Sequence, residues 1–540
     1  MNHPKEAETL NKIGMATIIM MASVFLSRIT GVAREMVLAA LAGAGIEVDA
    51  YRVAFVLPEI LNHILASGFL SVTFIPIFSR HLEGDREHEG WRTFSTILTV
   101  FGSLLLVLVV AGMILAPMAV PLLAAGRDDP QFIALAVRMT RITLPAQIFF
   151  FAGGMLMAVQ YAKTRFLLPA LAPLVYNLGI IAGGWLLGPR WGVEGFCWGA
   201  LAGAAIGSFA IQLVGAMRVG MRFCPLFDVR HPDLRRYIFL TLPLMIGLTM
   251  VFSTELFSKF FGSFLPAGAI AWIDYAMRVM LILVGFFGQA VGVASYPFMT
   301  QLAVQGRLRE LNATINKVLI YLSVVIPVSI LVVVLRHEIV RVLFERGRFT
   351  PTDTQMTALT LACLMTGAIG FVTQTVVNRG FYATQNTWLP TVFGSLAVLL
   401  SLPVYWAGLQ IWGVAGVGLA ISASALLQTL LLFSVWNRRS RNREAASVYR
   451  AYAKAALAGL AIGAILWPVH HGLRIYLNRP TFFQDAAVIG IVSAGFVVLT
   501  GLWGWTFKVE AILYLAGRAA SVPVLRRIRS GFRQVRSSAK

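Results

Sequence analysis

Charged residues are scarce in this sequence of 540 residues: they make up 13% of the chain, whereas 58% of the residues are hydrophobic. A soluble domain carries about 25% charged residues. The mean hydropathy is +0.76. A soluble protein of this length would form roughly two to four domains, and there are too few polar side chains here to cover their surfaces. The composition therefore excludes a soluble enzyme and a disordered chain, and it indicates a membrane protein.

Acidic residues and cysteines are also few. The chain has 24 Asp and Glu against 45 Lys and Arg, a formal net charge of +21, and only three cysteines, which lie far apart. No cysteine spacing suits a disulfide framework or a zinc site. The sequence has no phosphate-binding glycine loop of the P-loop type, and Arg341 stands where a zinc-protease helix beginning at His337 would need a second histidine. We therefore expect no catalytic residue, no metal and no cofactor.

Apolar stretches of spanning length fill the chain instead. A membrane-spanning helix needs about 20 apolar residues, and we count fourteen such stretches. They predict an all-α polytopic membrane protein with about fourteen transmembrane helices. The predicted spans are 13–41, 51–79, 94–123, 132–160, 167–188, 194–217, 237–262, 268–301, 318–345, 353–378, 388–408, 412–436, 453–473 and 484–507.

The basic residues indicate the orientation of these spans. If the N-terminus is cytoplasmic, thirty Lys and Arg fall on the cytoplasmic side and six on the opposite side. Cytoplasmic loops of membrane proteins carry such an excess of Lys and Arg. An even number of spans also places the C-terminus in the cytoplasm. The positive charge is thus mainly a signal of topology, and nine basic residues remain inside the spans or at their edges.

The chain contains an internal repeat with an offset of 221 residues. Trp191-Gly192-Val193 recurs as Trp412-Gly413-Val414, and the same offset relates Tyr161-Ala162 to Tyr382-Ala383 and Pro169 to Pro390. One period holds six spans, and an even number gives two parallel repeats, an arrangement common in transporters. We predict two six-helix lobes plus two further helices. The predicted parts are an N-terminal lobe (1–225), a C-terminal lobe (226–445), the two extra helices (446–507) and a basic cytoplasmic tail (508–540).

Charged residues inside the spans are the candidates for function, because an ionisable group in a membrane is costly unless it faces a cavity or a partner. Arginines gathered at one cavity favour an anionic substrate, since the guanidinium binds phosphate oxygens in pairs. The competing interpretation is a set of local salt bridges, which Glu255 and Lys259, four residues apart, fit as an intrahelical pair. The candidates are Arg28, Arg34 and Glu35 in the first span, Asp49, Arg52, Glu59 and Asn62 at or in the second, and Asp274 and Arg278 in the eighth.

The sequence resembles the MurJ/MviN lipid II flippases. The resemblance rests on the run Ser27-Arg28-Ile29-Thr30-Gly31-Val32-Ala33-Arg34-Glu35, on Gly43-Ala44-Gly45 with Asp49-Ala50, on Phe74-Ile75-Pro76-Ile77-Phe78, on Leu343-Phe344-Glu345-Arg346-Gly347 and on Gly380-Phe381-Tyr382-Ala383. It implies transport of undecaprenyl-diphosphate-linked disaccharide-pentapeptide across the bacterial inner membrane for peptidoglycan synthesis. It also implies a kinship with multidrug exporters of the MATE type.

The resemblance further implies roles for individual residues. Arg28, Arg34 and Arg278 match family arginines that line a headgroup cavity. Because of their charge or polarity and their places in the spans, we also predict Arg52, Glu59 and Asn62 as substrate contacts and Glu35, Asp49 and Asp274 as gating or supporting charges. The two extra helices match a groove for the lipid tail. The expected partners are lipid II, membrane lipids and the cell-wall synthesis machinery, and no nucleic acid.

The sequence departs from the family pattern in the second span and in the eighth. Asn62 and His63 stand where the family usually carries two arginines, and Met277 stands where it often has an acid. Two other functions therefore stay open: a flippase for another polyprenyl-diphosphate-linked glycan, and an ion-coupled multidrug exporter that would use carboxylates such as Glu35, Glu59, Glu255 and Asp274. A membrane scaffold without transport is the third alternative.

Overall fold

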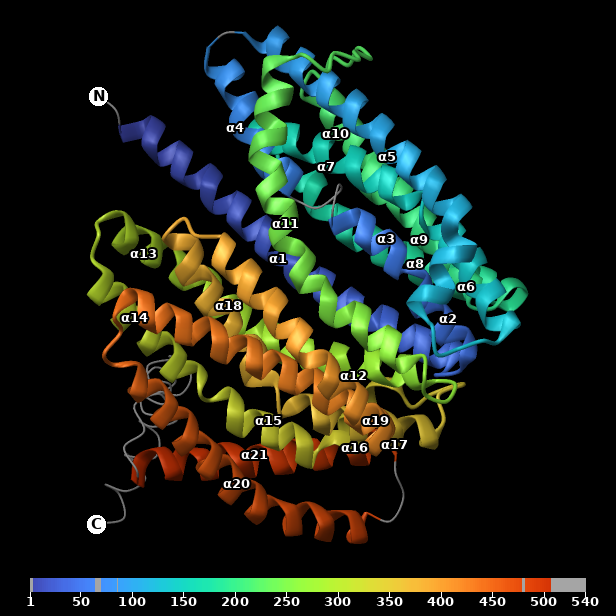
Figure 1. Cartoon of the computed structure of the whole chain (residues 1–540), viewed down its shortest axis with the longest axis vertical. Helices are drawn as coiled ribbons and strands as arrows, with labels where there is room; N and C mark the ends of the chain where they lie inside the picture. The colour runs from blue at the N-terminus through green and yellow to red at the C-terminus, as the bar shows by residue number, and fades with distance from the viewer. Residues whose placement is uncertain (1–2, 64–68, 85, 478–480, 507–540) are drawn as a thin grey trace, which may run out of the picture. The chain divides into compact units, whose positions relative to one another are not determined.

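The computed structural model describes residues 3–63, 69–84, 86–477 and 481–506, and every regular element in these ranges is a helix (Figure 1). The chain divides into two compact units. Unit 1 comprises residues 1–275 and 344–356, and unit 2 comprises residues 276–343 and 357–540. One helix, α12 (Ala269–Val284), runs from unit 1 into unit 2.

Unit 1 contains the helices up to α11 and the first residues of α12. Their bounds are α1 (His3–Ala42), α2 (Ile46–Ala54), α3 (Val56–Leu61), α4 (Phe69–Glu83), α5 (Glu87–Leu123), α6 (Pro130–Thr143), α7 (Ala146–Ala162), α8 (Leu167–Trp191), α9 (Glu194–Gly203), the π-helical η2 (Ala204–Ala210), α10 (Ile211–Arg218) and α11 (Pro232–Gly262).

Unit 2 contains the rest of α12 and the helices that follow it. Their bounds are the π-helical η3 (Gly285–Gln289), α13 (Ala290–Val304), α14 (Leu308–Leu322), α15 (Val325–Val334), α16 (Arg336–Phe344), α17 (Pro351–Met365), α18 (Ala368–Ala383), α19 (Trp388–Ser440), α20 (Ala445–Tyr476) and α21 (Phe482–Thr506). The last residue of α16 and the first turn of α17 belong to unit 1.

Nine helices in the described ranges are long and apolar enough to cross a membrane. The number is ten if α17 and α18, which are bent by 46° at a short break, form one broken span. Helices α1, with 40 residues, and α11, with 31, also exceed the length that a span needs, and both carry charged residues. The structure therefore confirms an all-helical polytopic membrane protein, and the figure of about fourteen spans remains a prediction.

The backbone repeats with the same 221-residue offset as the sequence. Gly192 ends α8 with φ 55° and ψ −136°, and Gly413 interrupts α19 with φ 55° and ψ −125°. Positive φ is uncommon outside glycine, yet Thr164 and Gln385, at φ 57° and 58°, share it. Gly220 and Arg441, also 221 residues apart, both have positive φ as well, at 85° and 51°. Each unit thus contains the same three turns, which supports an internal duplication.

Glycines allow the closest helix packing in each unit. A Cβ atom on Gly183 of α8 would lie 2.4 Å from the Cα of Gly199 on α9, and one on Gly179 would lie 2.6 Å from the Cα of Gly203. In unit 2, a Cβ on Gly416 would lie 1.8 Å from the carbonyl oxygen of Gly408. Small residues permit such backbone approach between membrane helices, where no hydrophobic force drives association.

Buried charges attach α20 and α21 to α16 in unit 2. Glu338 of α16 accepts hydrogen bonds from Arg474 and pairs with His470, both on α20. Arg474 also donates to Asp485 of α21, 2.5 Å away, and Asp485 accepts a second bond from Arg341. Because Glu338 and Asp485 are almost fully buried, this ion-pair cluster fixes the last two helices to the helix on which they pack.

Candidate functional site

The predicted site residues of α1 lie in its second half, where the helix packs against α8. Arg34 donates to Glu35, with 2.6 Å between Nη2 and Oε1, and to the amide oxygen of Asn177 on α8, 3.3 Å from Nη1. Asn177 in turn donates to the Ser27 carbonyl and to Thr30. Arg28 is exposed and makes no ion pair within the described ranges. Of the two predicted α1 arginines, one is therefore held in place and the other is available.

Arg52 of α2 joins three helices of unit 1. Its Nη2 lies 2.5 Å from Glu35 on α1, and its Nη1 lies 3.0 Å from Asp274 on α12. The rings of Tyr51 and Tyr275 flank the guanidinium, with centroids 5.6 and 5.2 Å from its central carbon. The side chains of Arg52, Glu35 and Asp274 are 5%, 4% and 8% exposed. The structure thus brings three sequence-predicted residues into one buried ion-pair cluster.

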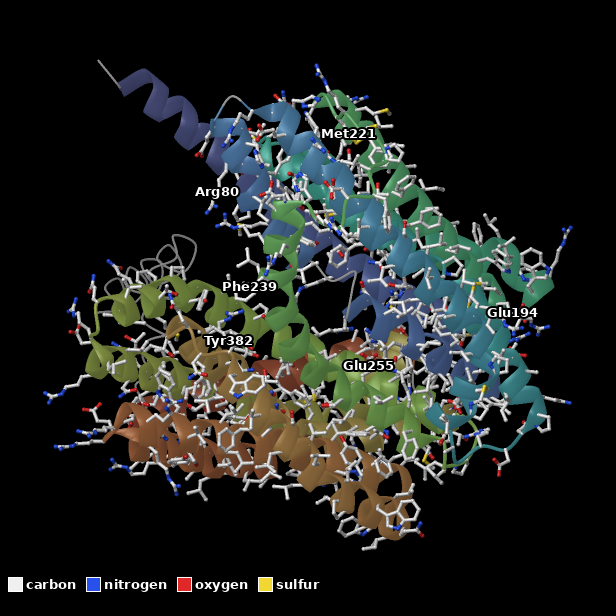
Figure 2. All side chains as sticks on the ribbon, turned by 45° about the horizontal axis from the view of Figure 1, so that its top comes forward. Arg80, Glu194, Met221, Phe239, Glu255 and Tyr382 are labelled. Carbon is white, nitrogen blue, oxygen red and sulfur yellow. The ribbon has the colours of Figure 1, made fainter. Side chains whose placement is uncertain are left out.

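The cluster continues from Asp274 to α11. Lys259 lies 3.9 Å from Asp274 and 2.7 Å from Glu255. The contact with Glu255 confirms the predicted intrahelical Glu255–Lys259 pair. Lys259 also forms a longer ion pair with Asp274 on α12. Figure 2 labels Glu255, the more exposed end of the chain of charges. We call these six residues the charge cluster, and its formal charge is zero: Arg34, Arg52, Lys259, Glu35, Glu255 and Asp274.

Asp49 contacts the beginning of α12. Its carboxylate accepts hydrogen bonds from the backbone amides of Gly268 and Ala271, at 2.7 and 2.9 Å, and lies 3.6 Å from Arg127. A carboxylate at this position satisfies amides that have no partner within the helix and complements the helix dipole. Asp49 is fully buried, so in this structure it is a cap that ties α2 to α12.

The second predicted span is broken near its proline. Pro58 has no N–H to donate to the carbonyl of Ala54, four residues earlier, and α2 ends at Ala54 while α3 begins at Val56. The hydroxyl of Thr143 lies 3.5 Å from that carbonyl. Beyond the break, Glu59 lies on α3, and half-buried Asn62 directly follows the last residue of that helix. The break therefore separates Arg52 on α2 from Glu59 on α3.

Arg278 lies on α12 in unit 2 and is half-buried. Its role alongside the arginines of α1 stays a prediction. The described residues include no group of His, Cys, Asp and Glu that could hold a metal ion.

Two residues of functional interest escaped the sequence analysis. Asn177 lies inside the apolar predicted span 167–188. The sequence feature that distinguishes it is that it carries the single side-chain amide of that span. Arg379 follows the predicted span 353–378, so the hydropathy pattern places it just outside the membrane. The structure places it inside α18, with its Nη2 donating to Gln289 at 3.2 Å and its Nη1 buried.

Comparison with known proteins identifies relatives over most of the chain. The sequence model of one family, described as lipid II flippase MurJ, matches residues 38–477. A lipid II flippase MurJ of Burkholderia cenocepacia is 28% identical over 450 residues, which are 82% of this chain and 87% of that protein. A probable lipid II flippase MurJ of Thermotoga maritima is 29% identical over 414 residues, 76% of this chain and 82% of that protein.

Solved structures show the same fold. A structure described as lipid II flippase MurJ in an inward closed conformation matches with a TM-score of 0.74 at 21% identity, covering 91% of this chain and 100% of that one. An inward-facing multidrug resistance transporter of the MATE family matches with a TM-score of 0.62 at 13% identity, covering 80% and 99% of the two chains. The fold is therefore shared with two classes of transporter.

Proposed function

Since the chain belongs to the lipid II flippase family MurJ, we propose that it carries lipid II from the cytoplasmic to the outer leaflet of the bacterial inner membrane by alternating access. The family match over residues 38–477 is the observation that carries this conclusion. The chain is a multi-pass membrane transporter of lipid II in peptidoglycan synthesis and not an enzyme. The direction, the access mechanism and the headgroup contacts below are our proposals.

The proposed topology has fourteen spans, both termini in the cytoplasm, and two parallel six-helix lobes followed by two extra helices. The excess of basic residues on one side supports the orientation. The three positive-φ turns that recur at a 221-residue offset support the two lobes. Parallel repeats of this kind permit one repeat to move against the other, which is the basis of alternating access in many transporters.

Arg28 and Arg34 of α1 are the proposed headgroup contacts in unit 1, and Arg278 of α12 is, separately, a proposed contact in unit 2. A diphosphate needs several cationic donors, and the planar guanidinium offers two parallel N–H groups to each phosphate. Arg28 is exposed, and Arg34 is the most exposed cation of the three in the charge cluster, at 19%. Asn177 orients Arg34 from the side, so that the guanidinium is positioned before the substrate arrives.

Binding then requires an exchange of partners at Arg34. In this structure Glu35 is shared between Arg34 and Arg52. When the diphosphate draws Arg34 away, Glu35 keeps the buried Arg52 as its counter-ion, and no uncompensated carboxylate is left in a low-dielectric site. Arg52 and Asp274 therefore serve as supporting charges, while Glu59 and Asn62, on α3 and at its end, are proposed to contact the polar part of the headgroup.

The first test is lipid II accessibility at the outer face of cells depleted of their own flippase and supplied with this chain. We expect the wild-type protein to restore accessibility and growth. Arg28→Ala should abolish both while the protein remains in the membrane at wild-type level. Arg439→Ala, which removes an exposed arginine at the end of α19, is the control for the loss of one positive charge and should transport normally.

The outcome also separates the alternatives. Full transport by Arg28→Ala would remove that residue from the headgroup site. If the wild-type chain fails to move lipid II but transports another polyprenyl-diphosphate-linked glycan, its substrate is that other lipid. This alternative is motivated by Asn62 and His63, which stand where the family usually carries two arginines. A drug exporter would need a carboxylate for cations, but Glu35, Glu255 and Asp274 are already in ion pairs.

A further inference from the structure

Arg379 is a half-buried arginine in unit 2 without a carboxylate partner among the described residues. It lies four residues before the end of α18, and its one hydrogen bond there joins Nη2 to the side-chain oxygen of Gln289 at 3.2 Å. Its Nη1 is buried and has no partner in the described ranges. An arginine has five N–H donors and no acceptor. A cation left unmatched within a membrane span is costly and is by default a candidate for ligand binding.

The neighbouring helix makes room for this guanidinium. A Cβ atom at Gly292 of α13 would lie 2.3 Å from Nη1 of Arg379, so any larger residue would displace the arginine. Glycine is unfavourable inside a helix relative to alanine, but at this position it leaves the space that the guanidinium occupies. Gln289 reaches Arg379 from the π-helical segment η3, and such segments occur often at functional sites.

The side-chain amide of Gln289 is the polar group that contacts Arg379 among the described residues. The amide of Gln289 accepts from Arg379 through its oxygen, which leaves its NH₂ group as a donor. The site therefore offers guanidinium and amide donors, and that combination suits a phosphate.

We propose that Arg379, Gln289 and Gly292 form a binding site for a lipid-borne phosphate, and that its ligand is the diphosphate of lipid II as it is taken up from the cytoplasmic leaflet. By the proposed orientation, α18 ends in the cytoplasm, and Arg379 is about 6 Å from that end by helix rise. Arg278 precedes Gln289 by eleven residues on the same span, about 16 Å farther toward the outer side. Unit 2 would then present two anion sites in succession. This inference rests on the proposed function.

The test measures binding separately from transport. Full-length protein in phosphatidylcholine nanodiscs is titrated with lipid II and, in a second series, with phosphatidylglycerol, and bound lipid is counted by native mass spectrometry. We expect Arg379→Ala to weaken lipid II binding about tenfold or more, as loss of a charge-assisted bidentate contact should. Gly292→Ala should reproduce the loss because its methyl group displaces the guanidinium. Arg439→Ala is the matched control and should bind as the wild type does.

Thermal stability distinguishes a ligand site from a structural one. An arginine held by the fold would lower the melting temperature when replaced, whereas Arg379→Ala should leave it unchanged or raise it, because an unmatched cation is removed. If the Arg379→Ala variant binds lipid II as tightly as the wild type does and transports it normally, the inference is overturned and the proposed function is left intact. Loss of phosphatidylglycerol binding alone would assign the site to a phospholipid and also overturn it. If the wild-type chain neither binds nor moves lipid II, the proposed function fails as well.

Discussion

The guanidinium of Arg52 lies 3.0 Å from the carboxylate of Asp274, and this contact bonds α2 to α12 across 222 residues of sequence. Arg52 also neutralises Glu35 of α1. One buried cation is therefore the counter-ion of two buried acids on two other helices, and it stabilises the part of unit 1 that holds Arg34, a proposed headgroup contact.

Replacing Arg52 with alanine should strongly destabilise unit 1. The change would leave Glu35 and Asp274 buried with fewer counter-ions, and breaking a buried ion pair from one side costs about 3–5 kcal/mol. We expect a clear fall in the melting temperature of the purified protein in detergent. The double change Arg52→Ala with Asp274→Ala should recover part of the loss, since one uncompensated acid is removed with the cation. A melting temperature for Arg52→Ala equal to the wild-type value would contradict the role of Arg52 as the shared counter-ion.

Asn177→Ala should weaken headgroup binding without unfolding the protein. The Asn177 side chain holds Arg34 through one hydrogen bond and α1 through two others. Loss of a hydrogen bond of about 1 kcal/mol lets Arg34 leave its orientation, so we expect lipid II affinity to fall about fivefold. The measurement is lipid II binding in nanodiscs, with diphosphate added as a competitor.

The matched control for Asn177 is Ser23→Ala. Ser23 also connects α1 to α8, through a hydrogen bond from its hydroxyl to the carbonyl of Ala170, but it does not touch Arg34. If both variants reduce lipid II affinity equally, the effect comes from loosening α1 and not from the orientation of Arg34.

Gly183→Ala should disrupt the packing of α8 on α9. The added methyl group would lie 2.5 Å from the carbonyl oxygen of Gly195 and 2.4 Å from the Cα of Gly199, and neither backbone atom can move away alone. Overpacking typically costs about 1–3 kcal/mol, so the folded yield and melting temperature should both fall. Gly154→Ala is the control, because a Cβ at that position of α7 would have no neighbour within 4 Å. It should be neutral or slightly stabilising.

Much of the candidate site could be predicted from the sequence because charge in an apolar span is costly. That rule selected Arg34, Glu35, Arg52 and Asp274, which the structure brings together in unit 1. The rule does not give the partners. That Arg52 lies between α1 and α12 depends on how three helices pack, and Asp49 contacts the beginning of α12 only because distant residues fold next to it.

The hydropathy pattern does not predict where the side chain of Arg379 lies. This residue follows the last residue of the predicted span 353–378, so the pattern assigns it to the loop after that span. The helix continues to Ala383, and the side chain turns back toward Gln289. A basic residue one turn from the end of a span can either reach the aqueous phase or be retained in the protein, and only the neighbouring Gly292 and Gln289 decide which occurs.

Arg474→Ala should release α20 and α21 from unit 2 while leaving the rest of that unit folded. Arg474 donates to Glu338 of α16 and to Asp485 of α21, and both acids are at least 98% buried. Without it, the partners left among the described residues are His470 for Glu338 and Arg341 for Asp485. We expect hydrogen exchange to rise in α20 and α21 but not in α14 or α18.

Arg450→Ala provides the comparison, since Arg450 is an exposed arginine on α20 whose guanidinium reaches only the carbonyl of Ala446 within the described part of the chain. This variant should exchange as the wild type does. Uniform acceleration throughout unit 2 in Arg474→Ala would mean that the ion-pair cluster stabilises the whole unit and not the attachment of its last two helices. Unchanged exchange would mean that the apolar contacts of Val334, Ile462, Leu466 and Val492 are sufficient for that attachment.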